Sequence, residues 1–188
     1  KGYKSKYTQI SKENPKGNLT AASSAPGIIK AMKHVNDKML DIKTIVVDDW
    51  QYMSSFEYFD RANEKGYDKF TQIAANLAMV AKLPKDLRDD LTVIFLTHSE
   101  DSTDINGNRK IKAKTIGKMI DNTLTLEGLF SIVLFGKVNK NDDGELEYGF
   151  ETQNSGENTC KSPMGMFDEG FIPNDLQLVK KRIEEYNN

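Results

Sequence analysis

The sequence predicts an α/β fold in which a mostly parallel sheet is flanked by helices and carries an antiparallel hairpin at its edge. Three observations lead to this fold class. Segments 44–47 and 91–99 are predicted strands with largely apolar runs that do not alternate, which is typical of strands buried on both faces of a parallel sheet. Helical periodicity precedes the first segment and fills the interval between the two, as in a βαβ unit. A third apolar segment, 131–138, is followed by a turn and a second strand, which predicts the hairpin.

The first half of the chain is predicted to supply helices around these strands. Ser24 is expected to cap a helix that has Pro26 in its first turn. The apolar residues of one face of this helix are Ile28, Ile29, Met32, Val35 and Met39. A second helix is expected after the first strand, and a third runs from about Asp68 until Pro84 ends or kinks it. The third helix has an apolar stripe of Phe70, Ile73, Leu77, Val80 and Leu83.

The second half is predicted to begin with two loops, an acidic and then Gly-rich one at 100–108 and a basic one at 109–118. The hairpin has its turn at 139–144 and its second strand at 145–152, and a polar loop follows at 154–165. Asn174 is expected to cap a final helix that packs through Leu176, Leu178, Val179 and Ile183. Since no repeat or linker divides the chain, we expect one domain over residues 1–188.

Composition limits the classes of function. The formal net charge of −2 excludes a global basic field, so any contact with nucleic acid must come from a local cluster. The single cysteine, Cys160, has no partner for an internal disulfide, which favours a reducing cytoplasm. No apolar run approaches the roughly 18 residues of a membrane span. We therefore expect a cytoplasmic protein without a membrane contact.

Two carboxylates, Asp48 and Asp49, come directly after the first predicted strand. Ligands of open α/β sheets bind at the carboxyl ends of the strands. A carboxylate held there can bind a Mg²⁺ ion that also carries nucleotide phosphates, as in a Walker B motif. We expect Asp48 to be the metal ligand. Asp49 is expected to orient the attacking water or to fix the groups that surround the ligands of the metal. The alternative is a core strand that ends in two solvated acids.

Three further residues are candidates for the same site. Thr97 and His98 are the polar residues in which the second strand ends, and they are expected to sense the γ-phosphate of ATP. The alternative for His98 is a hydrogen-bonded histidine at a strand end. Lys161, in the polar loop, is expected to reach the nucleotide of an adjoining subunit as a cation acting in trans, and the alternative is a solvated lysine.

The sequence lacks the phosphate-binding loop of such an ATPase. No G-x-x-x-x-G-K-[ST] pattern occurs in it. Gly107 and Gly117 each stand near a lysine, but neither follows a buried strand at the required spacing.

Several segments together resemble the phage-encoded P-loop ATPases with a RecA-like core, a group associated with single-strand annealing and recombination. The resemblance covers most of the chain from about residue 40 and rests on Ile45–Asp49, Glu64–Phe70, Phe95–Glu100, Lys112–Asp121, Leu126–Phe130 and Thr159–Phe167. The lysine-rich segment 114–119 and the segment 161–167 are its more specific parts. The family opens with a strand, a Walker A loop and a helix, and this sequence departs from it by lacking all three. We expect that a segment before Lys1 supplies them, so that the single RecA-like domain is incomplete at its N-terminus.

The resemblance implies a phage DNA-recombination ATPase in the cytoplasm of a bacterial host, with ATP and Mg²⁺ as cofactors. Its expected partners are single-stranded DNA, further copies of the chain in a ring or filament, and a phage or host recombination protein. Segment 109–118 follows the sensor-like strand, where RecA-like proteins carry a DNA-binding loop. Its five basic residues and absence of acids predict phosphate contacts through Arg109, Lys110, Lys112, Lys114 and Lys118. The alternative is a solvated basic loop that faces the acidic segment 100–104.

Two other functions remain open from the sequence. A degenerate ATPase without a phosphate-binding loop would act as a module that binds DNA or protein. A Mg²⁺-dependent nuclease would use Asp48 and Asp49, but such enzymes usually gather more carboxylates around two metal ions, and the only other acid so placed is Glu100.

Overall fold

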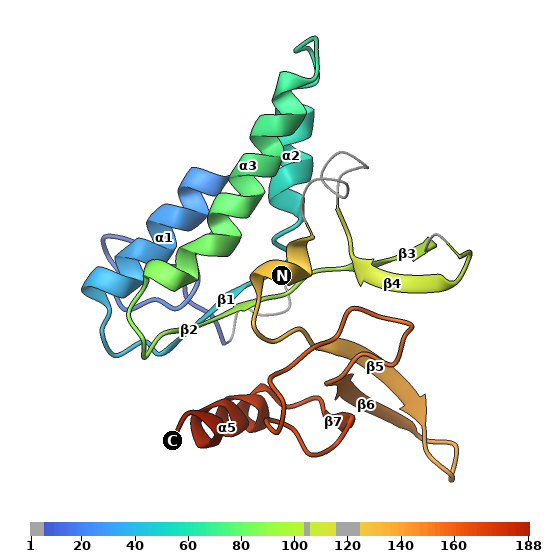
Figure 1. The fold of residues 1–188 in the computed structure, drawn as a ribbon. Helices are drawn as coiled ribbons and strands as arrows, with labels where there is room; N and C mark the ends of the chain where they lie inside the picture. The colour runs from blue at the N-terminus through green and yellow to red at the C-terminus, as the bar shows by residue number, and fades with distance from the viewer. Residues whose placement is uncertain (1–5, 104–105, 116–124) are drawn as a thin grey trace. The chain divides into compact units, whose positions relative to one another are not determined.

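The computed structural model describes residues 6–103, 106–115 and 125–188, and it divides the chain into two compact units, Lys1–Thr97 and His98–Asn188. Both units combine helices with small sheets, so the protein is mixed α/β (Figure 1). The expectation of one domain over residues 1–188 stays a prediction. Among the described residues, no helix combines the length and the apolar character that crossing a membrane requires.

The first unit contains a pair of parallel strands with helices between them in sequence. Its elements are α1 (Ala25–Lys38), β1 (Thr44–Val47), α2 (Tyr52–Asp60), α3 (Asp68–Lys82), a 3₁₀ turn (Leu83–Asp86) and β2 (Thr92–Phe95). β1 pairs with β2 in parallel, in a register that runs from Thr44 opposite Thr92 to Val47 opposite Phe95. Because parallel neighbours need a long crossover, the α2–α3 hairpin that connects them fits the βαβ pattern expected from the sequence.

The helices of this unit form where the sequence predicts them. The Ser24 hydroxyl accepts a hydrogen bond from the Gly27 amide at the start of α1. α1 and α2 both pack against α3, and the core between the elements is formed by Ile28, Met32, Met53, Ile73, Leu77, Val80 and Leu87. α3 ends at Lys82, where the 3₁₀ turn containing Pro84 takes over. Ser24, the stripe of α3 and the stop at Pro84 are confirmed.

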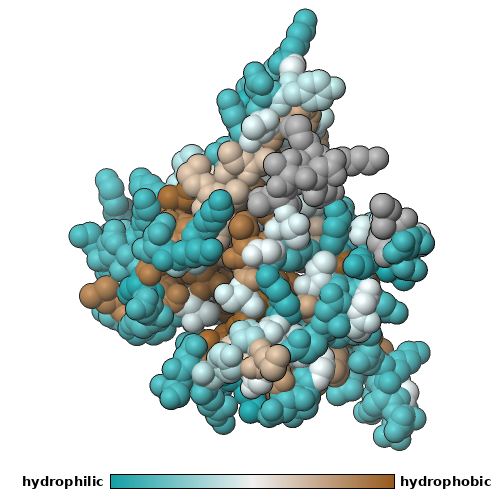
Figure 2. All heavy atoms as spheres, in the orientation of Figure 1, coloured by the Kyte–Doolittle hydropathy of each residue, from teal (hydrophilic) through white to brown (hydrophobic). Residues whose placement is uncertain are grey.

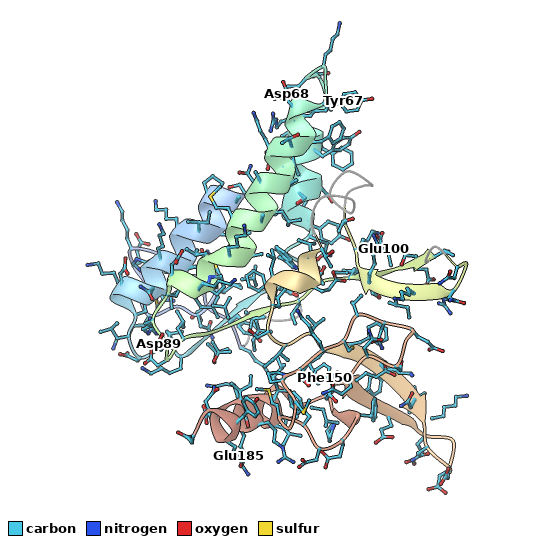
Figure 3. All side chains as sticks on the ribbon, in the orientation of Figure 1. Tyr67, Asp68, Asp89, Glu100, Phe150 and Glu185 are labelled. Carbon is cyan, nitrogen blue, oxygen red and sulfur yellow. The ribbon has the colours of Figure 1, made fainter. Side chains whose placement is uncertain are left out.

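Lys69, which is buried, and Arg88, which is half-buried, donate hydrogen bonds to backbone carbonyls in the first unit. Lys69 donates to the carbonyl oxygens of Arg61 and Glu64, at 3.3 and 2.9 Å, and so closes the loop between α2 and α3. Figure 3 labels Tyr67 and Asp68 at the tip of this helical hairpin. Arg88 donates to the carbonyl oxygens of Val35 and Asn36, both at 3.0 Å, and to that of Ile42. Arg88 therefore satisfies carbonyls at the C-terminal end of α1 and fixes the approach to β1.

The second unit contains two antiparallel sheets. The first pairs β3 (Ser99–Thr103) with β4 (Arg109–Ala113), and the second has the order β5 (Phe135–Lys140), β6 (Leu146–Glu151), β7 (Phe171–Pro173). A 3₁₀ turn (Leu126–Leu129) and the final helix α5 (Leu176–Asn187) complete it. Its core is formed by Met166, Phe167, Ile172 and Val179, with Phe150 and Ile183 packed against it.

The structure corrects the predicted sheet in two respects. The β5–β6 hairpin is not the edge of the parallel pair: among the described residues it belongs to a separate antiparallel sheet. β1 is not buried on both faces, since Val46 is 49% exposed. With only one hydrogen-bonded neighbour in the described part of the chain, β1 covers less surface than a central strand of a larger sheet does.

Four predicted boundaries are also wrong. The second strand ends at Phe95 rather than at residue 99, since Ser99 already begins β3. Segment 100–103 is strand rather than loop, because residues with low strand propensity are held by pairing with β4. The third apolar strand begins at Phe135 instead of 131, and Val133 forms an isolated bridge with Lys161. Asp175, not Asn174, caps α5: its side chain accepts from the amides of Gln177 and Leu178.

Candidate functional site

The carboxyl ends of β1 and β2 are joined by hydrogen bonds that bracket Asp48 and Asp49. The Leu96 amide donates to the Val47 carbonyl at 2.9 Å, and the Trp50 amide donates to the Leu96 carbonyl at 3.3 Å. Thr97 follows Leu96 directly, so it leaves the sheet at the same edge as the two acids. The structure therefore brings together three of the predicted site residues.

Asp48 and Asp49 lie in an exposed turn. Asp49 has a φ of 50°, and among the described residues it is the only non-glycine residue with a positive φ. Asp tolerates this left-handed conformation better than most residues, but the conformation still carries a cost and is found more often at functional sites. Gln51 donates from its side-chain amide to the Asp49 carboxylate at 3.4 Å, which restrains the direction of that carboxylate.

The residues directly after this turn are buried, which the sequence did not reveal. Trp50 is 3% exposed and packs edge-to-face on Phe95, the last residue of β2, with 5.0 Å between the ring centroids. Gln51, directly before α2, and Ser54, in its first turn, are 8% and 2% exposed. The side-chain Oε1 of Gln51 and the Ser54 hydroxyl have no hydrogen-bond partner in the described residues. A polar pair beside a Trp gives no periodic signal, so pattern reading could not have placed these residues in the interior.

The donor chemistry of this turn fits a nucleotide-bound Mg²⁺ better than a metal held by protein alone. Within the described ranges, no three His, Cys, Asp or Glu side chains gather in a group able to hold a metal ion. Mg²⁺ in nucleotide sites is bound by one or two carboxylates together with phosphates and waters. Asp48 is exposed and makes no ion pair with a described residue, so its oxygens are accessible to such an ion.

His98 and Lys161 belong to the second unit. His98 is exposed, and its carbonyl accepts a hydrogen bond from the Lys114 amide at 2.8 Å. That bond extends the β3–β4 ladder by one pair beyond Ser99 and Ala113. The predicted association of Lys161 with a neighbouring copy's nucleotide stays a prediction.

The loop that carries Lys161 is anchored on both sides of that residue. Lys161 and Val133 exchange two backbone hydrogen bonds, at 2.8 and 3.0 Å, and the Gln153 side chain donates to the Ser162 hydroxyl at 2.6 Å. Burial, with a smaller contribution from the charge of Glu151, raises the pKa of the neighbouring Cys160 to about 11. Cys160 is therefore a protonated thiol near neutral pH, which argues against a nucleophilic role.

The predicted DNA-binding loop is in large part a strand. Arg109 to Ala113 form β4, whose other edge is bound through the Ile111 amide to the Glu157 carbonyl at 2.7 Å. The Ala113 amide donates to the Glu127 carboxylate at 2.8 Å. Residues on both sides of β4 thus hold it in place, which a count of basic residues cannot show. Lys118 lies outside the described residues.

The antiparallel register divides the predicted DNA-binding residues between two faces. Arg109 lies on one face and its side chain binds Asp101 at 2.8 Å. Lys110 and Lys112 lie on the other face, and the alternation continues to the exposed Lys114. Lys112 forms an ion pair with Glu100, which is labelled on β3 in Figure 3, at 3.3 Å. The alternative interpretation, a basic segment that faces acids, therefore applies to Arg109 and Lys112.

The ion pair between Lys112 and Glu100 also weakens the nuclease alternative, which needs Glu100 as a third carboxylate. Glu100 lies directly opposite Lys112 in the β3–β4 register and is paired with it. A carboxylate that neutralises a neighbouring lysine is a poor candidate for a shared metal site.

Comparison of the chain with family models, with curated proteins and with solved structures found no match.

Proposed function

We propose that the chain forms part of a RecA-like P-loop ATPase that handles single-stranded DNA in phage recombination. The observation that carries the proposal is the turn at the end of β1. Two adjacent parallel strands, connected through helices, present Asp48, Asp49 and Thr97 at their carboxyl ends, where ligands of open α/β sheets bind. This placement of Asp48 and Asp49 supports the Walker B resemblance of Ile45–Asp49.

Each residue has a separate task in this proposal. Asp48 binds the Mg²⁺ ion, which when bound neutralises charge that develops on the transferred phosphoryl group. Asp49, restrained by Gln51, orients the attacking water or the second shell of the metal. Thr97 and His98 report the state of the γ-phosphate to the second unit, because they join β2 to the β3–β4 hairpin. The Walker A loop has no counterpart in residues 1–188.

DNA binding in this proposal belongs to one face of the hairpin. Lys110 and Lys114 make no ion pair with a described residue, and Lys112 is paired with Glu100, at a side chain that stays 25% exposed. No aromatic side chain stands between the three lysines, so we expect contacts to phosphates without base stacking. Self-association in a ring or filament would bring Lys161 of one copy to the nucleotide of the next.

The test compares two aspartates at opposite ends of β1 in the complete gene product. Asp48→Asn keeps the shape of the side chain and removes its charge, and we expect Mg²⁺-dependent ATP hydrolysis to fall on the order of 10²–10³-fold. Asp41→Asn changes an exposed aspartate that precedes β1, and it should leave turnover unchanged. Phosphate release measures turnover, and circular dichroism verifies the fold.

Nucleotide binding gives a second readout. Mg²⁺ should strengthen the binding of a labelled ATP analogue to Asp41→Asn and should have little effect on Asp48→Asn. Normal turnover in Asp48→Asn, or equal losses in both variants, would remove Asp48 from the proposed site. Retention of DNA binding without any hydrolysis by the wild type would favour the degenerate, non-catalytic module.

A further inference from the structure

The β5–β6 hairpin exposes an apolar surface beside an acidic tip. Val138 and Tyr148 lie opposite each other on one face and are 51% and 57% exposed, and Leu146 on the same face is 57% exposed. Phe150, further along this face, packs against the core of the second unit (Figure 3). The surface is therefore a continuation of the core into solvent, on a hairpin that the ladder keeps in register.

The tip of this hairpin carries an excess of negative charge. Asp142 and Asp143 are the middle residues of the turn that the hydrogen bond from the Gly144 amide to the Asn141 carbonyl closes at 2.9 Å. Glu145 follows them, and all three acids are exposed and make no ion pair with a residue in the described part of the chain. Lys140, exposed and opposite Leu146, is a basic residue on the same face. We call the surface formed by Val138, Leu146, Tyr148 and the three acids the acidic hairpin.

The first unit carries a groove of the opposite character between α1 and α3. Pro26, Ile29 and Met79 supply its apolar wall, and Met79 is 51% exposed. Lys30 and Lys33 stand on its rim, are exposed, and make no ion pair with any residue the structure describes. Figure 2 shows hydrophobic residues gathered over the α1–α3 region among hydrophilic ones. We call this surface the lysine groove.

We propose that the acidic hairpin of one copy of the chain docks in the lysine groove of a second copy. Both surfaces pair an exposed apolar centre with an excess of charge of one sign: three acids beside one lysine at the hairpin, and two lysines at the groove. Burial of the apolar centres drives such a contact, while the charges select partner and orientation. The apolar wall of the groove suits a protein surface with an apolar centre better than the phosphates of nucleic acid.

The contact uses different surfaces on the two copies, so it is heterologous and propagates. A contact of this kind generates a ring if the rotation between successive copies closes and a filament if it does not. The inference names the surfaces for the self-association that the proposed ATPase requires, and in that respect it rests on the proposed function. Its test contains neither ATP nor DNA, so the two can fail separately.

A charge swap tests the contact with the 188-residue chain. Asp142→Lys with Asp143→Lys reverses the hairpin, and Lys30→Glu with Lys33→Glu reverses the groove. Each double variant should weaken self-association at least about tenfold in sedimentation velocity, because like charges then meet. An equimolar mixture of the two should associate again, since each reversed surface finds an opposite charge on the other variant. Raising the salt concentration should weaken both the wild-type and the mixed assembly.

Two matched controls separate a specific contact from general charge effects. Lys12→Glu with Lys16→Glu changes the net charge as the groove variant does, on an exposed loop, and should associate like the wild type. Val138→Ser with Tyr148→Ser leaves every charge in place and should weaken association, whereas Leu19→Ser with Leu40→Ser, at residues 46% and 59% exposed, should not.

The outcomes that overturn the proposal are equally defined. A wild-type chain that stays monomeric up to about 1 mM has no such contact. A mixture of the two reversed variants that stays monomeric while the wild type associates places the interface elsewhere. Equal weakening by the Lys12 and Lys16 control shows that net charge, and not the lysine groove, controls association. Circular dichroism on each variant excludes loss of fold as the cause.

Discussion

The turn after β1 and the β3–β4 hairpin are both dense in charge, but the fold treats their charges differently. Asp48 stands in an exposed turn and makes no ion pair with a described residue. On the hairpin, Arg109 is bound to Asp101 and Lys112 to Glu100. Two of the predicted DNA contacts are thus already occupied by acids from the neighbouring strand.

The difference shows which part of a charge pattern carries functional information. Acids at the end of a strand are placed by the ladder itself, and their like charges do not cancel. Basic residues in a strand meet whatever the cross-strand partner offers, and here the partner strand is acidic. Charge counted along the sequence therefore overstates the basic character of 109–118, while it describes the turn at 48–49 correctly.

The largest effect is expected on ATP turnover when Lys161 is replaced. Lys161 makes none with the described residues, and its loop is held by backbone bonds that Lys161→Ala does not remove. A cation that acts in trans is worth about 10³–10⁵ in rate, so ATP turnover by the assembled complete gene product should fall by about that much. Mixing Lys161→Ala with Asp48→Asn should restore part of the activity.

A phosphate-release assay across mixing ratios measures this complementation, with Lys85→Ala as the control for loss of an exposed lysine. Absence of complementation at every ratio would mean that Lys161 serves its own subunit or none. In that case the lack of an ion pair at Lys161 would not indicate a role in catalysis.

The second prediction concerns what holds the acid turn in place. Arg88, with its side chain 18% exposed, donates to carbonyls of Val35, Asn36 and Ile42, while exposed Lys43 binds only Asp90 at the surface. Arg88→Ala removes a donor from all three carbonyls, of which Val35 keeps the Met39 amide, and should lower the free energy of unfolding by about 2–4 kcal/mol. Lys43→Ala should cost much less, because exposed ion pairs contribute little. Urea unfolding of both variants decides, and equal losses would contradict the prediction.

The sequence was a good guide where local rules control structure. The cap at Ser24, the stripe of α3, the stop at Pro84 and the turn of the β5–β6 hairpin each follow from a few neighbouring residues. The acids at the end of β1 were also found, because a strand that runs into two carboxylates is visible in one dimension. The mixed α/β class is confirmed, and the RecA-like core stays a prediction.

Long-range contacts explain what the sequence could not give. β3 has low strand propensity and forms only because β4 pairs with it. The buried position of Gln51 depends on how α2 packs after the turn, and the role of Arg88 depends on carbonyls some fifty residues earlier in the chain. The division of the lysines between two faces required the register, which no charge count contains.

The third prediction separates the lysine face of the β3–β4 hairpin from its general charge. Replacement of Lys110, Lys112 and Lys114 by Ala should weaken binding to a labelled single-stranded oligonucleotide and flatten the salt slope by about two units, since each phosphate contact contributes about 0.7. Glu100→Gln should strengthen binding by about two- to fivefold, because it removes the negative charge that lies opposite Lys112 on this face. Fluorescence anisotropy across a salt series measures both effects. A triple Ala variant at Lys12, Lys16 and Lys85 is the control, and an equal change in slope there would remove the hairpin from the DNA site.

The smallest effect is expected at Arg109, although the sequence ranks it with the other basic residues. Arg109 lies on the face opposite Lys110 and Lys112, and its pair with Asp101 is exposed on both sides, with side chains 74% and 64% accessible. Arg109→Gln removes one positive charge and one exposed ion pair, and such pairs add little to stability. We therefore expect an unchanged melting temperature and an unchanged salt slope for DNA binding. Lys110→Gln, which removes the same charge from the other face, should flatten the slope by about 0.7. A loss of that size in Arg109→Gln would show that DNA contacts both faces of the hairpin, and that the cross-strand acids yield to phosphate as readily at Asp101 as at Glu100.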